Sequence, residues 1–210
     1  MDYLEDLIKR YPVLDECKKD IYSVYNYIAD SYVRGGKLLI AGNGGSAADA
    51  EHIVGELMKG FKKKRTLSDD FKEELKAVSY QKSPDLLESL QGALPAIALD
   101  GHPALTTAFI NDRSPLLCFA QQVYGYAKPA DSFLAISTSG NSKNIIYAAV
   151  TAKALHIPVL GLTGKTGGEL AEYTDACIKV PETETFKVQE LHLPIYHCLC
   201  LMLEEKFFEI

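Results

Sequence analysis

Two residues able to move protons stand four positions apart in LLIAGNGGSAADAEHIVGEL, the segment covering residues 38–57. If a helix begins near Ser46, this spacing places His52 and Glu56 on one helical face. A carboxylate can remove a proton from carbon, and an imidazole can transfer protons at oxygens near neutral pH. Taken alone, such a pair is more often an ordinary surface or buried hydrogen bond. A functional interpretation therefore needs partners elsewhere in the chain.

The last helical segment supplies polar residues within a strongly apolar sequence. TFKVQELHLPIYHCLCLML, residues 185–203, contains Gln189, Glu190, His192 and His197. A polar cluster on a core helix is unfavourable unless its members are paired or functional. Because Gln189 and His197 are about two turns apart, we expect their side chains to approach a common point.

Two polar loops follow predicted strands and lead into helices: GNGGS at 42–46 and STSGNS at 137–142. Glycines let the backbone approach an anion, and hydroxyls and N–H groups at a helix N-terminus bind it. Neither loop is a Walker A or GxGxxG motif, which disfavours nucleotides as ligands. Both could be simple turns with capping serines, but four hydroxyl residues in six positions favour a phosphate monoester at the second. A third glycine-rich loop at 163–168 is not assigned to the site.

The elements that must position these residues alternate along the chain. Short apolar runs without polar alternation predict strands buried on both faces, at 37–41, 96–99, 132–137, 158–162 and 176–180. Helical patterns separate most of them, at 47–60, 103–110 with 115–124, 142–155, 167–173 and 187–208. The alternation predicts an α/β fold, a three-layer α/β/α sandwich with a five-stranded parallel sheet. Ligands are expected beyond the carboxyl ends of its strands.

Two helical regions lie outside this alternation. Residues 2–34 read as N-terminal helices divided near Pro12. Residues 66–94 read as two short charged helices with Ser68 and Ser83 as N-caps, and they resemble an insertion more than a domain. We therefore expect one domain over residues 1–210.

Composition narrows the class of protein. Hydrophobic residues at 47% and charged residues at 24% are typical of a globular domain, and a net charge of −6 disfavours a general nucleic-acid binder. The basic run 62–65 is interpreted as a solvated helix end. Five cysteines without a CxxC pair indicate buried, reduced thiols. With no signal-peptide core and no run of transmembrane length, we expect a cytoplasmic protein without nucleic-acid or membrane partners.

Five ordered motifs resemble the sugar isomerase (SIS) domain family, and within it most closely the phosphoheptose isomerases. That group interconverts sedoheptulose 7-phosphate and a heptose 7-phosphate. The resemblance extends from about residue 20 to the end, apart from 66–94. The motifs are AGNGGSAADAEHIVGEL, AFINDR at 108–113, AISTSGNSKN, VLGLTGKTGG and VQELHLPIYH.

The resemblance implies roles position by position. Glu56 and His197 match the catalytic pair of an aldose–ketose isomerisation through a cis-enediolate. A divalent metal, with zinc the first choice, is implied on His52, Glu56, Gln189 and His197. A homotetramer with sites built from more than one subunit is implied as well. The implied substrate contacts are Asn43, Gly44, Gly45, Ser46, Asn111, Asp112, Ser137, Thr138, Ser139, Ser142 and Gln189.

Two positions depart from the phosphoheptose isomerase pattern. Phe186 stands where that group usually has Asp, and Lys59-Gly60 stand where it has Gly-Arg. Both lie by the substrate in the family, so the resemblance implies either sedoheptulose 7-phosphate or a related ketose phosphate as the substrate. The alternative is a non-catalytic sugar-phosphate sensor or assembly protein, since the family includes a relative that binds the replication initiator. Retention of the Glu56, Gln189 and His197 matches favours catalysis.

Overall fold

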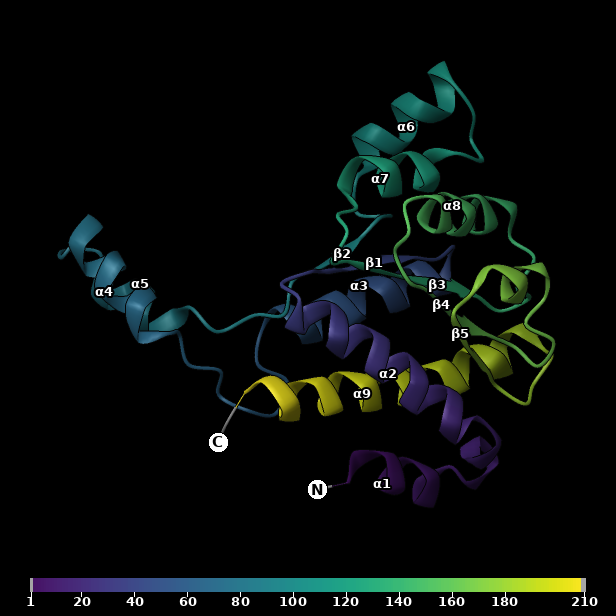
Figure 1. Cartoon of the computed structure of the whole chain (residues 1–210), viewed down its shortest axis with the longest axis horizontal. Coiled ribbons are helices and arrows are strands. Elements are labelled where there is room, and N and C mark those ends of the chain that lie inside the picture. Colours follow the sequence, from purple (N-terminus) through teal and green to yellow (C-terminus); the bar gives the residue numbers. More distant parts are fainter. Residues whose placement is uncertain (1, 209–210) are drawn as a thin grey trace.

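The computed structural model describes residues 2–208 and is built on one parallel sheet (Figure 1). The strand order is β2-β1-β3-β4-β5, and every neighbouring pair is parallel. All five predicted strands are present, with bounds within one residue of those predicted. The strands are β1 (Leu38–Ala41), β2 (Ala96–Ala98), β3 (Ser132–Ser137), β4 (Val159–Thr163) and β5 (Ala176–Lys179).

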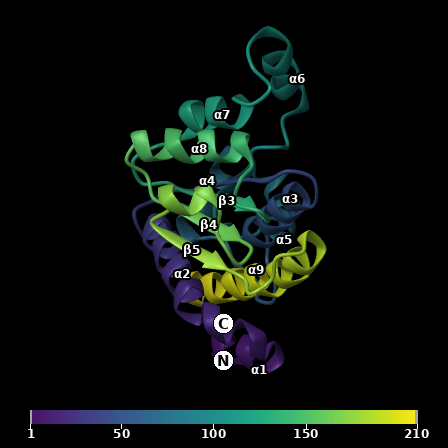
Figure 2. The same ribbon diagram turned by 90° about the vertical axis from the view of Figure 1, so that its right-hand side faces the viewer.

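Helices cover both faces of the sheet, which confirms the three-layer prediction (Figure 2). Leu38 and Ile40 of β1 pack into the layer formed by α1 (Tyr3–Arg10), α2 (Lys18–Val33), α3 (Gly45–Met58) and α9 (Thr185–Phe207). Leu39 and Ala41 pack into the opposite layer, formed by α7 (Cys118–Tyr126), α8 (Lys143–Ala154) and the short 3₁₀ helix η2 (Glu169–Tyr173). Because alternate residues face apolar layers on each side, the strands carry no polar alternation.

The N-terminal helical region divides where predicted. A 3₁₀ helix, η1 (Pro12–Cys17), begins at the proline and separates α1 from α2. Proline lacks an N–H and disfavours helical geometry in the residue before it, which accounts for the break.

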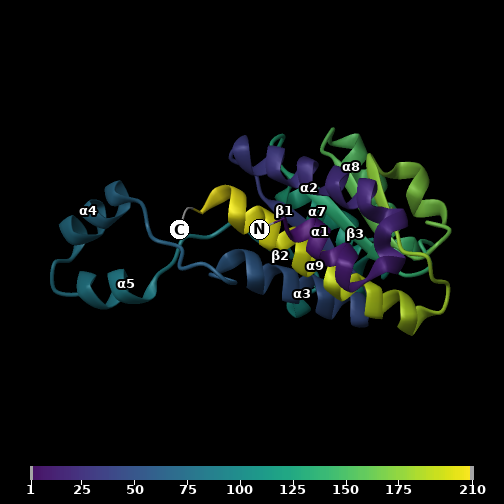
Figure 3. The same ribbon diagram turned by 90° about the horizontal axis from the view of Figure 1, so that it is seen from below.

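The predicted insertion forms a hairpin of α4 (Asp69–Val78) and α5 (Ser83–Ser89) that projects from the sheet and its helices (Figures 1 and 3). No residue of α4 is buried, and Ser83 is the buried residue of α5. Ser68 caps α4 as predicted, accepting a hydrogen bond from the Phe71 N–H at 3.4 Å. The predicted Ser83 cap is wrong, because Ser83 already lies in the first turn and its hydroxyl donates back to the Tyr80 carbonyl at 3.0 Å.

The basic run 62–65 is not a solvated helix end, because α3 ends at Met58 and Arg65 is 1% exposed. The guanidinium donates to the carbonyls of Glu56 and Leu57 at the end of α3, and to the carboxylate of Glu204 at 2.9 Å. The last carbonyls of a helix lack intrahelical partners, so a buried cation satisfies them. The sequence alone does not reveal this contact, since Glu204 follows 139 residues later.

The cysteines are free, as predicted, and four of the five are buried. Within residues 2–208, no helix is long and apolar enough to cross a membrane.

Candidate active site

Helices α3 and α9 lie side by side and run in the same direction. Successive residues of α3 therefore lie opposite successive residues of α9. At the start, a Cβ placed on Gly45 would lie 2.5 Å from Nε2 of Gln189. In the middle, Nε2 of His52 lies 3.4 Å from Nε2 of His197. This pairing gathers polar side chains from segments about 145 residues apart in sequence.

The centre of the pair holds a cluster of His52, Glu56 and His197. Nε2 of His52 is 3.3 Å from Oε1 of Glu56, as the four-residue spacing predicted. The Phe61 ring packs beside His197, with ring centroids 5.5 Å apart. Burial, followed by the neighbouring His52, lowers the pKa of His197, while Glu56 acts in the opposite direction. His197 is therefore largely neutral near pH 7 and able to exchange a proton.

A buried tyrosine and an aspartate support this cluster, although the sequence does not single them out. The Tyr196 hydroxyl donates to Oδ1 of Asp49 at 3.2 Å and lies 3.1 Å from Nδ1 of His52. Burial raises the pKa of both Tyr196 and Asp49. The signal in the sequence is faint: Asp49 lies one turn before His52, and Tyr196 directly precedes His197.

The side-chain amide of Gln189 lies against Gly45, at the start of the α3–α9 pair. Its approach to a common point with His197 stays a prediction. Eight residues of helix span about 12 Å, so two side chains meet only if both bend toward the gap between them. His192, on the same helix, is fully buried, and burial lowers its pKa to about 4, which marks it as a neutral core residue.

The two polar loops meet at the carboxyl ends of β1 and β3, which are neighbours in the sheet. Asn43 of the first loop exchanges two hydrogen bonds with Asn144 at the start of α8, at 2.8 and 3.0 Å. From β1 the chain continues to β2 on one side, and from β3 to β4 on the other. The loops therefore lie at the topological switch point, where α/β sheets bind ligands. Asn144 is an additional candidate contact, found in the motif AISTSGNSKN.

The second loop is shaped by internal hydrogen bonds. Oγ of Ser137 and Oγ of Ser142 are 3.1 Å apart, and Oγ of Ser139 accepts from the Asn141 N–H at 3.1 Å. Gly140 has φ +68°, and a Cβ there would collide with the Gly167 carbonyl. The third loop, which the sequence left outside the site, thus packs directly on the second.

Asn111 and Asp112 lie away from the α3–α9 cluster. They end α6 (Pro103–Asp112), which lies with α7 on the opposite side of the sheet from α9 (Figure 1). The two side chains are exposed and hydrogen-bonded to each other at 2.8 Å. A single chain does not bring them to His197.

The central cluster is chemically suited to a metal, although its geometry is incomplete. Within residues 2–208, no group of three or more His, Cys, Asp or Glu side chains is arranged as a metal centre. Yet the contacts of 3.3 and 3.4 Å around Nε2 of His52 match the roughly 3.3–3.4 Å between ligands of a tetrahedral zinc with bonds of about 2.0–2.1 Å. Oε2 of Glu56 is buried without a hydrogen-bond partner, and its ion-pair partner is Nζ of Lys59, 3.5 Å away. These donors fit a cation.

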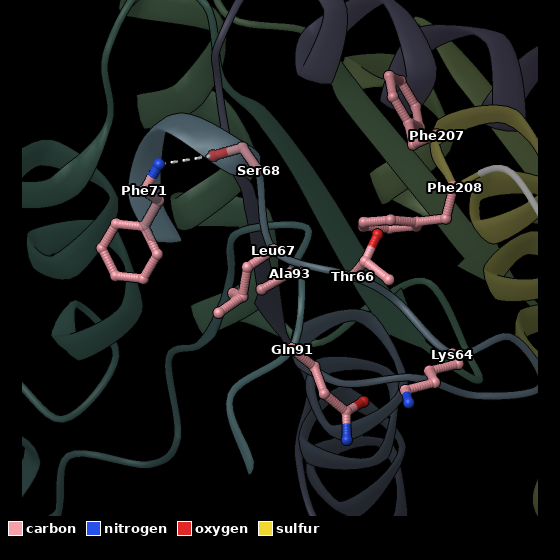
Figure 4. A pocket seen from close by; sticks show the side chains of 10 residues that line it. Lys64, Thr66, Leu67, Ser68, Phe71, Gln91, Ala93, Phe207 and Phe208 are labelled. Carbon is pink, nitrogen blue, oxygen red and sulfur yellow. Dashed lines mark hydrogen bonds between the residues drawn. The ribbon is translucent and has the colours of Figure 1, made fainter. Parts of the chain in front are cut away.

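A cavity of about 740 Å³ lies elsewhere, between the base of the α4–α5 hairpin and the end of α9 (Figure 4). Its lining contains no carboxylate and no imidazole. We therefore assign the chemistry to the α3–α9 cluster and not to this cavity.

Comparison with known proteins agrees with this geometry. Residues 96–202 match the family model of the SIS domain. The phosphoheptose isomerase of Aneurinibacillus thermoaerophilus is 38% identical over 194 residues, covering 92% of this chain and 85% of that protein. The solved phosphoheptose isomerase of Francisella tularensis superposes with a TM-score of 0.76 at 30% identity, covering 97% and 95% of the two chains. That of Neisseria gonorrhoeae gives 0.70 at 27%, covering 95% and 94%.

The chain therefore belongs to the SIS domain family, as its motifs indicated. Its relatives place it among the phosphosugar isomerases of that family, an enzyme similar to the phosphoheptose isomerases.

Proposed function

We propose that this isomerase converts the ketose and aldose forms of a sugar phosphate through a cis-enediolate, with sedoheptulose 7-phosphate as the first candidate. The observation that supports it most is the position of the Glu56, His52 and His197 cluster. His52 and Glu56 lie on α3, the helix that begins at the glycine loop of the switch point, and His197 of α9 lies beside them. Gly45 and His52 are seven residues apart, about 10 Å along the helix, comparable with the length of an extended sugar phosphate.

In this proposal the second loop holds the phosphate. Ser137, Thr138, Ser139 and Ser142 supply hydroxyls directly before α8, whose N-terminus favours an anion. The first loop contacts the sugar backbone through Asn43, Gly44, Gly45 and Ser46, with Gln189 beside Gly45.

The proton transfers are assigned to Glu56 and His197. Glu56 removes the proton from one carbon and returns it to the neighbouring carbon, so the carboxylate is regenerated. His197 donates a proton to the carbonyl oxygen and accepts one from the neighbouring hydroxyl. Its lowered pKa keeps it able to do both near neutral pH.

We also propose a divalent ion, with zinc the first candidate, held by His52, Glu56 and His197. Gln189 would complete the set only by turning away from Gly45. When bound, the ion would polarise the carbonyl of the substrate.

Asn111 and Asp112 are assigned to the substrate through a second copy of the chain. Their exposure, and their distance from the cluster in one chain, support sites shared between subunits of a homotetramer. A single domain over residues 1–210 and a cytoplasmic location stay predictions.

The proposal is tested by the purified protein on a panel of ketose phosphates, followed by NMR with and without chelator. Glu56→Gln should abolish turnover while leaving sugar-phosphate binding largely intact. Glu51→Gln, an exposed change on the same helix, is the matched control and should be active. Full activity of Glu56→Gln would remove Glu56 from the mechanism. Binding without turnover of any ketose phosphate by the unaltered protein would favour the non-catalytic alternative.

A variant of Phe186 tests substrate preference on the same panel of ketose phosphates. The residue is 55% exposed at the start of α9, one turn before Gln189. Phe186→Asp restores the carboxylate usual in phosphoheptose isomerases, so it should raise turnover of sedoheptulose 7-phosphate relative to other ketose phosphates. An unchanged ranking of substrates would show that Phe186 does not select the sugar.

A further inference from the structure

The hydroxyl of Tyr196 has one proton and two close neighbours. It donates to Oδ1 of Asp49 at 3.2 Å, and its oxygen lies 3.1 Å from Nδ1 of His52. Tyr196 is 2% exposed, so water does not compete for these contacts. The direction in which the tyrosine hydroxyl donates its proton determines which ring nitrogen of His52 carries the imidazole proton.

We propose that Asp49 and Tyr196 fix the tautomer of His52, so that Nδ1 carries the ring proton and Nε2 presents a lone pair to the cluster. A carboxylate only accepts hydrogen bonds, so the Tyr196 hydroxyl donates its proton to Asp49. The tyrosine oxygen is then the acceptor in its second contact, and Nδ1–H of His52 is the donor. A neutral imidazole has one N–H, which leaves Nε2 unprotonated.

The next contact is consistent with this order. Nε2 of His52 and Nε2 of His197 are 3.4 Å apart, and one of them must donate. With Nε2 of His52 unprotonated, Nε2–H of His197 is the donor. Asp49, Tyr196, His52 and His197 then form one chain of hydrogen bonds in which each link has one donor and one acceptor.

The inference rests on the proposed function, because it gives Asp49 and Tyr196 a positioning role at the proposed site. The lone pair on Nε2 of His52 lies 3.3 Å from Oε1 of Glu56. Two acceptor atoms at this distance repel each other, and a cation bound by both relieves the repulsion. Partners that orient a ligating histidine in this way typically contribute 10–100-fold to metal affinity.

Long-range ¹H–¹⁵N NMR on metal-free protein, labelled with ¹⁵N-histidine, reads the tautomer directly. His52→Gln assigns the His52 signals by their loss. We expect a protonated Nδ1 and an unprotonated Nε2 in the unaltered protein. The opposite tautomer there, in which Nε2–H of His52 donates toward His197 and Nδ1 accepts from the Tyr196 hydroxyl, overturns the proposal without any variant.

Tyr196→Phe removes the hydroxyl and keeps the ring, so the preference for protonated Nδ1 should be lost. Zinc affinity, measured by competition with a chelator, should fall roughly 10–100-fold. The control is Tyr32→Phe, which removes another buried hydroxyl, one that donates to the Pro95 carbonyl at 3.2 Å, and should change neither readout. An unchanged tautomer and unchanged affinity in Tyr196→Phe would overturn the positioning role.

These readouts separate the two proposals. The ring proton is observed without turnover, so the expected tautomer in a protein inactive on every ketose phosphate contradicts only the proposed function. An active isomerase with Nε2 of His52 protonated contradicts only the role of Asp49 and Tyr196.

Discussion

Replacing Arg65 with methionine should lower the free energy of unfolding by about 3 kcal/mol. The Arg65 and Glu204 side chains are 0% and 1% exposed, and Nε lies 2.9 Å from Oε1. Methionine keeps much of the apolar stem but removes the charge and every donor. The carbonyls of Glu56 and Leu57 lose their side-chain partner, and Glu204 stays buried.

The size of this loss in stability depends on the hydrogen bonds that Glu204 keeps in the variant. Breaking a buried ion pair by removing one partner costs roughly 3–5 kcal/mol. Here the loss should lie at the lower end, because Glu204 still accepts from the N–H groups of Phe61, Lys62 and Lys63, at 2.8, 2.8 and 3.1 Å. For a domain of this size, the melting temperature should fall by about 6–12 °C.

Urea unfolding followed by circular dichroism measures the change. Lys76→Met is the matched control, because it removes an exposed ion pair whose side chains are 43% and 74% exposed. That pair should contribute only about 0.2–0.5 kcal/mol. If Arg65→Met proves no more destabilising than Lys76→Met, the buried pair does not hold the structure together as argued.

Three further outcomes are expected. Burial acts to raise the pKa of Glu204, but hydrogen bonds from the 61–63 backbone and from Arg65 outweigh it and lower the pKa below its ordinary value. Its contribution to stability is therefore present above about pH 4.5 and lost as the pH falls below that value, and Glu204→Gln should flatten urea midpoints measured between pH 3 and 5. Gly45→Ala should displace the Gln189 amide and raise KM several-fold in steady-state assays. An unchanged KM would show that Gln189 does not contribute to substrate binding. Replacing 69–89 with a short linker should change the unfolding free energy by less than about 1 kcal/mol, because Ser83 is the one buried residue of that segment; loss of cooperative unfolding would contradict this.

The sheet can be predicted from the sequence because strands buried on both faces leave short apolar runs, such as 132–137. Helix starts are harder to place. Helix α3 begins at Gly45, two residues before the predicted start, because the glycine loop turns directly into the helix with Gly44 at φ +56°. A conformation available mainly to glycine is chosen by the fold around it, and hydrophobic periodicity does not report it.

The site is predictable only where one element fixes the geometry. His52 and Glu56 meet because one turn of helix separates them, whatever surrounds that helix. The contact of Tyr196 with Asp49, and the place of Gln189 against Gly45, depend instead on how α9 lies along α3. Spacing along either helix contains no information about that register.

The register of α9 on α3 is fixed at its far end by the pair Arg65 and Glu204, which links stability to the proposed chemistry. Arg65 binds the last carbonyls of α3, and Glu204 lies seven residues beyond His197 on α9. A slip of one residue along α9 would turn its side chains by about 100° and take His197 away from His52. Arg65→Met should therefore lower turnover at temperatures where the protein is still folded. An Arg65→Met protein that is destabilised but fully active would show that the contacts around Tyr196 hold the register without the distant ion pair.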